Sequence, residues 1–221
     1  MNDHITPSTL SRNSFRNQPF GKILEWNKTT DGLIGSSDFA NFKLTVYQSG
    51  IIRVQASRYA TFESNPYSVV VRPIATDFEI QELEDLLILT TAILRVEINL
   101  AAFSLAFFDQ KGNLLNQDDS FGVAWIGTEV TTYKKLQQNE KFIGLGEKTG
   151  NLNRFGKAYT HWNTDYFAYG VGDDPLYLSI PFYMGVHDQG HYGIFLDNTH
   201  KSLFNFGASN NRFASFSAEA G

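Results

Sequence analysis

Apolar and polar residues alternate with a period of two along much of the chain, a pattern that predicts short β-strands. Over residues 42–47, Phe, Leu and Val alternate with Lys, Thr and Tyr, and Gln48-Ser49-Gly50 then leads into a second apolar stretch at 51–55. Two such runs joined by a glycine-containing turn are typical of a β-hairpin. The sequence shows no convincing 3.6-residue periodicity, so we expect an all-β protein.

The same alternation recurs farther along the chain. Residues 94–99 alternate Leu, Val and Ile with Arg, Glu and Asn, which predicts a strand with one solvated face. Residues 103–107 repeat the pattern before the turn sequence Asp-Gln-Lys-Gly-Asn at 109–113. Further strands are expected at 129–134, 141–145, 176–186, 192–196, 202–206 and 212–216. A dozen or so short strands separated by turns predict a large antiparallel β-sandwich.

Local features refine this expectation. Pro181 cannot donate a backbone hydrogen bond, which predicts a sheet edge or a bulge at that point. No repeat or linker divides the chain, and we interpret the polar run at 116–120 as a loop. Residues 1–18 are rich in Ser, Asn and Thr and are expected to form a flexible N-terminal arm. One sandwich domain is therefore expected over residues 19–221.

Composition limits the classes of partner. The 221 residues include 19 Phe and 10 Tyr, enough apolar area for a sizeable core. The lack of cysteine excludes a disulfide framework and a thiolate metal site. A net charge of −5 argues against nucleic acid and anionic membranes as partners. The N-terminus shows no secretory signal, so a cytoplasmic location is expected. Oligomerisation is left open.

Several apparent chemical motifs lack their necessary context. Gly144-x-Gly146 follows a predicted strand, but no helix pattern follows it to hold a pyrophosphate. His187 and His191 have the spacing of metal ligands on a helix, yet Asp-Gln-Gly at 188–190 predicts that they flank a hairpin turn. The five histidines show no Ser or Cys partner in a nucleophile context. No cofactor and no metal are therefore expected.

Trp162 and Asp165 form a polar–aromatic pair with two interpretations. In the structural interpretation, Trp162 packs at the sandwich edge and Asp165 caps a turn. In the functional interpretation, Asp165 accepts hydrogen bonds from sugar hydroxyls beside an aromatic surface formed by Trp162, Tyr166 or Phe167. The residues alone favour the structural interpretation.

A dense run of landmarks between Gly144 and Phe206 resembles a known family. The landmarks are Gly144-Leu-Gly-Glu147, Arg154-Phe-Gly-Lys157, Trp162-Asn-Thr-Asp165, Asp174-Pro-Leu-Tyr-Leu-Ser-Ile-Pro-Phe182 and Gly193-Ile-Phe-Leu-Asp-Asn198. Their order and spacing resemble the N-terminal β-sandwich domain of glycoside hydrolase family 31, which contains α-glucosidases and α-xylosidases. The resemblance implies a galactose mutarotase-like supersandwich and an oligosaccharide or α-glycoside as the substrate of the full enzyme.

The same resemblance implies a role for the loop at 162–167. In family 31 a loop of this domain reaches the active site, and the aspartate of its aromatic-Asn-x-Asp pattern contacts the sugar on the leaving-group side; the matching residue is Asp165. The position two residues on also touches substrate in some members, and Phe167 there can stack but cannot donate a hydroxyl hydrogen bond. Both catalytic aspartates of the family come from a (β/α)₈ barrel. We therefore expect no catalytic residue in this chain, which stops before that barrel, and no activity from it alone.

Two other functions remain open. The first is a free-standing carbohydrate-binding or mutarotase-like sandwich, in which His161 and Glu147 are the candidate acid–base pair, although their spacing does not support them. The second is a structural domain that touches no ligand. Fold alone does not separate these hypotheses, because function depends on the site.

Overall fold

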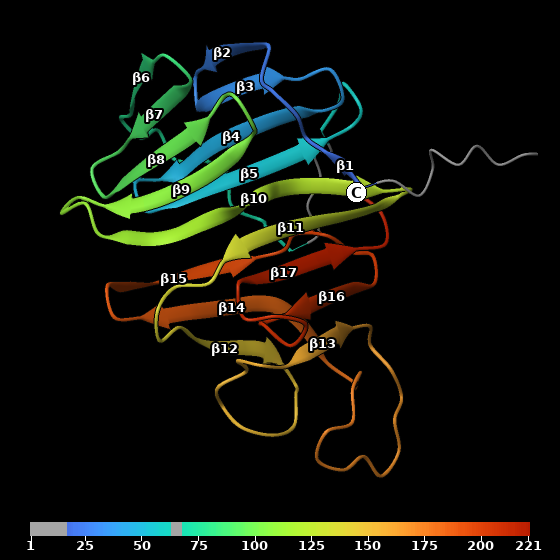
Figure 1. Ribbon diagram of the computed structural model, residues 1–221. Coiled ribbons are helices and arrows are strands. Elements are labelled where there is room, and N and C mark those ends of the chain that lie inside the picture. Colours follow the sequence, from blue (N-terminus) through green and yellow to red (C-terminus); the bar gives the residue numbers. More distant parts are fainter. Residues whose placement is uncertain (1–16, 63–67) are drawn as a thin grey trace, which may run out of the picture.

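The computed structural model describes residues 17–62 and 68–221, and it shows strands and no helix in these ranges (Figure 1). The strands are β1 (Gln18–Pro19), β2 (Glu25–Thr29), β3 (Gly32–Ser36), β4 (Asn41–Gln48), β5 (Ile51–Ser57), β6 (Glu79–Leu83), β7 (Leu86–Thr90), β8 (Leu94–Asn99), β9 (Ser104–Asp109), β10 (Leu114–Ile126), β11 (Glu129–Lys135), β12 (Lys141–Gly146), β13 (Ala158–His161), β14 (Ser179–His187), β15 (Gly190–Phe195), β16 (Ser202–Asn205) and β17 (Phe213–Ala218). The all-β prediction is confirmed.

The strands form one large sheet and two small ones, and all of their pairings are antiparallel. The large sheet has ten strands in the order β13-β16-β17-β11-β10-β9-β8-β7-β6, and β1 pairs with β10 off this path. The small sheets are β2-β3-β4-β5 and β12-β14-β15. Figure 1 shows β10 running between the N-terminal and C-terminal halves of the molecule.

Two apolar cores join these sheets face to face. The first contains Phe42 and Leu44 of β4, Leu87 of β7 and Ile98 of β8, each fully buried. The second contains Tyr183 of β14 together with Phe142, Leu145, Phe204, Phe206 and Ala214. Each small sheet therefore covers one half of the large sheet, and the predicted antiparallel sandwich is confirmed.

Most predicted strands and turns have counterparts in the structure. The predicted hairpin at 42–55 is β4 and β5, and the predicted strand at 94–99 is β8. The turn at 109–113 is closed by the carboxylate of Asp109, which accepts hydrogen bonds from the backbone N–H groups of Lys111 and Asn113 at 2.8 Å. The strand predicted at 176–186 begins later, at Ser179.

The predicted loop at 116–120 is wrong, because these residues lie inside β10. Three residues of this polar run, Asn116, Asp118 and Asp119, are buried in the sheet. Asp118 accepts a hydrogen bond from the backbone N–H of Leu105 at 2.8 Å and pairs with the ammonium group of Lys134 at 2.5 Å. Because the lysine neutralises the aspartate across the β10–β11 ladder, a sequence that looks like a solvated turn is accommodated in the interior.

Pro181 lies at a bulge in the central strand of the three-stranded sheet. The register shifts between Gly144, which faces Tyr183, and Gly146, which faces Ser179. Both glycines have left-handed φ angles, 129° and 74°, and a Cβ at Gly144 would lie 2.6 Å from the carbonyl oxygen of Phe182. The two glycines thus allow β12 to approach β14 closely, and the prediction of a bulge is confirmed.

The predicted N-terminal arm falls almost wholly outside the described residues, and Gln18 at its end already lies in β1. The described part of the chain contains no helix with the length and apolar character needed to cross a membrane.

Candidate functional site

The connection between β13 and β14, residues 162–178, forms a long loop that projects from the C-terminal half of the sandwich (Figure 1). Its side chains are unusually aromatic for exposed positions. Trp162 is 54% exposed and Phe167 91% exposed, and Tyr166, Tyr169 and Tyr177 are also exposed. Asp165 lies exposed among them. The loop therefore presents rings and a carboxylate to solvent on a rigid sheet, a common location for binding residues.

In the Trp162-Asn163-Thr164-Asp165 sequence, the two middle residues make hydrogen bonds that hold the loop. The side-chain oxygen of Asn163 accepts a hydrogen bond from the backbone N–H of Ser179 at 2.9 Å. The backbone N–H of Thr164 donates to the carbonyl oxygen of Leu176 at 2.9 Å, and its hydroxyl donates to the carbonyl oxygen of Trp162 at 2.8 Å. Asn163 and Thr164 thus close the base of the loop, and Trp162 and Asp165 remain available on its surface.

Residues directly after β12 hold the far side of this loop. The Glu147 carboxylate accepts hydrogen bonds from the Tyr169 hydroxyl at 3.1 Å and from the backbone N–H of Leu178 at 3.2 Å. The hydroxyl oxygen of Thr149 accepts a hydrogen bond from the backbone N–H of Gly172 at 2.9 Å. Two residues of one short segment therefore fix three separate points of the loop.

Lys148, between these two residues, provides a buried anchor. Its side chain is fully buried, and its ammonium group lies 2.5 Å from Oδ1 of Asp174 and donates to the carbonyl oxygen of Thr160 at 2.6 Å. The second oxygen of Asp174 accepts a hydrogen bond from the backbone N–H of Thr160 at 2.5 Å. Arg154 donates to the carbonyl oxygens of Lys148, Thr149 and Asn151, so the anchoring segment is itself held in place.

The loop carries a local excess of negative charge. The hydroxyl of Tyr177 lies within hydrogen-bonding range of Asp165, and desolvation, followed by the charge of Asp165, raises the pKa of Tyr177. The hydrogen bond to Glu147 is the main cause that raises the pKa of Tyr169. Asp165 therefore has a hydroxyl beside it and open solvent around it, which suits a carboxylate that accepts hydrogen bonds from an incoming polyol.

His161 and Glu147 do not form an exposed acid–base pair. His161 is 4% exposed, its ring contacts Phe204 with centroids 4.7 Å apart, and neither ring nitrogen has a hydrogen-bond partner. Burial, together with the charge of Lys148, lowers the pKa of His161 to about 4. Because the imidazole is enclosed and the Glu147 carboxylate is bound to Tyr169 and Leu178, this geometry does not favour mutarotase chemistry.

His187 and His191 lie on either side of a hairpin turn. This is the β14–β15 turn, as predicted, and His187 faces Gly190 across the ladder. Within residues 17–62 and 68–221, no three His, Asp or Glu side chains come together in a group that could hold a metal ion.

The sequence matches the family model described as the glycosyl hydrolase 31 N-terminal galactose mutarotase-like domain, over residues 41–205. The chain belongs to glycoside hydrolase family 31. This match covers β4 and β5 of one small sheet, the whole of the other small sheet and the loop at 162–178, so the supersandwich that the resemblance implied is the fold of this domain.

Family 31 enzymes are also found among the similar proteins. Alpha-glucosidase 2 of Bacillus thermoamyloliquefaciens is 35% identical over 182 residues, which cover 81% of this chain and 23% of that protein. The family 31 dextranase of Flavobacterium johnsoniae, solved with isomaltotriose, superposes with a TM-score of 0.86 and 34% identity over 92% of this chain and 26% of its own. The chain thus spans about a quarter of the length of these relatives.

Sequence reasoning found the exposed residues of the loop but missed most of its anchors. Trp162, Asp165 and Phe167 lie on the same loop, and all are exposed. The roles of Lys148 and Thr149 had no sequence signal, because a polar residue after a strand is usually solvated. Asp174 lies in one of the stretches that resemble family 31. Its partner Lys148 is 26 positions away in the sequence, so the pairing depends on the fold.

Proposed function

We propose that this chain is the non-catalytic N-terminal domain of a family 31 α-glycosidase and that its loop at 162–178 forms part of the subsite for the leaving-group sugar. The full enzyme would hydrolyse α-linked glucosides or related sugars with retention of configuration. In this proposal Asp165 accepts hydrogen bonds from hydroxyls of that sugar, and Trp162 and Phe167 offer rings against which it stacks.

One observation carries the proposal: Asp165 is exposed on a loop that is fastened on both sides of it. Asn163 and Thr164 fix its base, and Glu147 fixes positions 169 and 178 farther along. A carboxylate on a flexible loop loses affinity because the loop must be ordered on binding. The anchored loop avoids much of that cost, which supports a binding role over a merely connecting one.

The bond-breaking groups are assigned to a barrel of the same polypeptide, as the resemblance implies. A retaining glycosidase needs two carboxyl groups about 5 Å apart, one as nucleophile and one as acid/base. In support of a barrel contact, the outer face of β14 and β15 carries Ile180, Phe182, Met184 and Phe195, each between 39% and 44% exposed. An apolar sheet face of this kind suits a large packing partner.

The test is Asp165→Ala in an enzyme that carries this domain joined to its family 31 barrel. Loss of charged hydrogen bonds, each worth roughly 1.5–3 kcal/mol, should lower kcat/KM on a disaccharide about ten- to a hundredfold. An aryl glycoside lacks the hydroxyls of the second sugar and should be affected much less.

Asp38→Ala is the matched control, because Asp38 is an exposed carboxylate between β3 and β4, in the other half of the sandwich. It should leave both substrates unaffected. Equal losses on both substrates with Asp165→Ala, or no loss on either, would return Asp165 to a purely structural role.

A further inference from the structure

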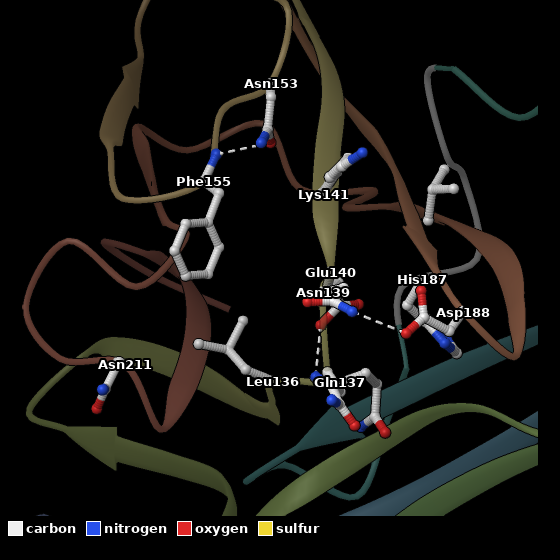
Figure 2. Close-up of a pocket in the computed structure, with 12 residues that line it drawn as sticks. Leu136, Gln137, Asn139, Glu140, Lys141, Asn153, Phe155, His187, Asp188 and Asn211 are labelled. Atoms are coloured by element: carbon white, nitrogen blue, oxygen red, sulfur yellow. Dashed lines mark hydrogen bonds between the residues drawn. The ribbon is translucent and has the colours of Figure 1, made fainter.

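A second candidate binding site lies away from the loop at 162–178. This site is an open pocket with a cavity volume of ≈ 790 Å³ (Figure 2). It is lined by the connection between β11 and β12, by the β14–β15 turn and by two loops that carry Phe155 and Asn211. No residue of the loop at 162–178 lines it. Its volume lies within the range of about 300–1,000 Å³ typical of small-molecule sites.

Five of the twelve residues that line this pocket carry amide side chains, beside the apolar residues Leu136, Phe155 and Val186. The amides are those of Gln137, Gln138, Asn139, Asn153 and Asn211. One aromatic ring, Phe155, is 44% exposed beside them. Lys141 and Asp188 bring opposite charges to the same rim, so the two largely offset each other.

The floor and sides of the pocket are held by hydrogen bonds. Glu140 is 5% exposed, and its carboxylate accepts hydrogen bonds from the backbone N–H of Gln137 at 2.8 Å and from the Tyr192 hydroxyl at 2.6 Å. Asn139 has a left-handed φ of 58°, and its amide donates to Asp188 at 2.9 Å, which ties the connection to the hairpin turn. The pocket is therefore built before any ligand arrives.

The wall that carries the ring is fixed in the same way. The side-chain oxygen of Asn153 accepts hydrogen bonds from the backbone N–H groups of Phe142 and Phe155, both at 3.1 Å. These bonds join the loop to β12 and set the direction in which the Phe155 ring leaves the backbone. Figure 2 shows this ring at the side of the pocket, with Asn153 above it and Leu136 below.

We infer that this pocket is a second carbohydrate-binding site, which takes a short neutral glycan. Amide groups both donate and accept hydrogen bonds, as sugar hydroxyls do, and an exposed ring can stack on the apolar face of a pyranose. An anion would need an excess of positive charge, and Asp188 and Glu140 oppose Lys141. A purely apolar ligand would meet Leu136, Phe155 and Val186 but would leave the polar groups of the other lining side chains unpaired. The inference goes beyond the proposed role of Asp165 and does not depend on it.

The experiment is a titration of the isotope-labelled 221-residue chain with maltotriose and with isomaltotriose, followed by NMR of the backbone amides. We expect saturable shifts at residues 137–141, 153–155, 187–189 and 211, with a Kd on the order of 1 mM for at least one of the two glycans. The comparison between the glycans shows which linkage the pocket accepts.

Variants at Phe155 make the inference specific. Phe155→Ala should weaken binding about tenfold or more, the change expected from losing one contact worth ~1.4 kcal/mol. Phe155→Tyr keeps the ring and should restore binding, and an unchanged amide spectrum elsewhere confirms that each variant is folded. Phe39→Ala, at an exposed ring between β3 and β4 and outside both candidate sites, is the control and should not alter these shifts.

Three outcomes would overturn the inference. They are no saturable shift in the pocket with either glycan, the same affinity for Phe155→Ala as for the unaltered chain, and shifts confined to residues 162–178. The last outcome would support the proposed role of the Asp165 loop while removing the second site, so the two proposals fail separately.

Discussion

The ammonium group of Lys148 lies 2.5 Å from Oδ1 of Asp174, and the lysine side chain is fully buried. Both groups also bind the backbone of Thr160 in β13, the lysine through the carbonyl oxygen and the aspartate through the N–H. The pair therefore links the segment after β12 to the C-terminal part of the loop at 162–178 through a strand of the large sheet. Its removal should affect both the stability of the domain and the order of the loop.

Lys148→Met is expected to destabilise the domain by about 3–5 kcal/mol, because it leaves the Asp174 carboxylate without its cation in a partly buried place. The loop at 162–178 should also exchange amide hydrogens faster than in the unaltered chain. Urea unfolding and hydrogen exchange by mass spectrometry measure the two effects.

The matched control for this variant is Lys201→Met. Lys201 pairs with Glu219 at 3.7 Å, but both side chains are largely exposed, so its loss should change the stability by no more than about 0.5 kcal/mol. If the two variants have the same free energy of unfolding, the buried Lys148–Asp174 pair does not stabilise the domain more than an exposed pair does.

Acid should destabilise the domain through His161. Burial and the charge of Lys148 lower the pKa of His161 to about 4 in the folded state, whereas its ordinary value is 6.5. The folded state therefore resists protonation, and the stability from the neutral imidazole is complete above pH 6.5 and is lost as the pH falls towards about 4. The loss is at most about 3–4 kcal/mol, from 1.36 kcal/mol for each unit of the pKa difference of about 2.5.

His161→Phe should flatten this dependence between pH 6.5 and about pH 4, because the ring contact with Phe204 is kept and the titrating group is removed. Urea unfolding midpoints across this window measure it. His191→Gln, on the exposed face of β15, is the control. A His161→Phe domain that loses stability in acid as steeply as the unaltered one would contradict the assignment.

The exposed apolar face of β14 and β15 should make the chain self-associate when it is produced alone. Met184→Lys places a charge in the middle of that face and should reduce both light scattering and the binding of a dye for apolar surface. Ile126→Lys is the control, since Ile126 is 43% exposed but lies on the large sheet. A clean monomer without dye binding before any substitution would contradict a role for this face in packing.

The chain alone should not hydrolyse aryl α-glucosides or α-xylosides above a buffer blank. In the proposed role Asp165 would position a sugar, but it would not replace the nucleophile and the acid/base that a retaining mechanism needs. Release of the aryl group, followed in a continuous absorbance assay, measures this. Turnover that persists after repurification and disappears on mutation of a residue in this chain would contradict the expectation.

The strands of this domain could be predicted where burial alternates cleanly. β4 and β8 each have one buried face, so their sequences carry the period of two that identifies a strand. The sequence of β3, Gly-Leu-Ile-Gly-Ser, does not alternate apolar with polar residues, and it was not predicted as a strand. In the structure a Cβ at Gly35 would lie 2.5 Å from the ring of Phe42, so this glycine makes room for a core side chain.

The candidate site was predictable only in part, because the residues that hold its loop are far apart in the sequence. Trp162 and Asp165 stand out because an aromatic ring and a carboxylate in a loop are chemically distinctive. The groups that hold the loop act over long sequence separations, as between Lys148 and Asp174, and their partners are defined only once β12, β13 and β14 are assembled. Buried pairs such as Asp118 and Lys134 are hidden in the same way.

β10 contributes Val123 and Trp125 to the first core, and it pairs through its C-terminal part with β11 in the second half of the molecule. The two cores contain no buried residue in common, so we expect their unfolding to be coupled through β10 and its neighbours in the large sheet. The bulge between Asp118 and Val123 lies in the middle of this strand. Weakening the ladder there would let the halves melt as separate cooperative units, and a single thermal transition would become two.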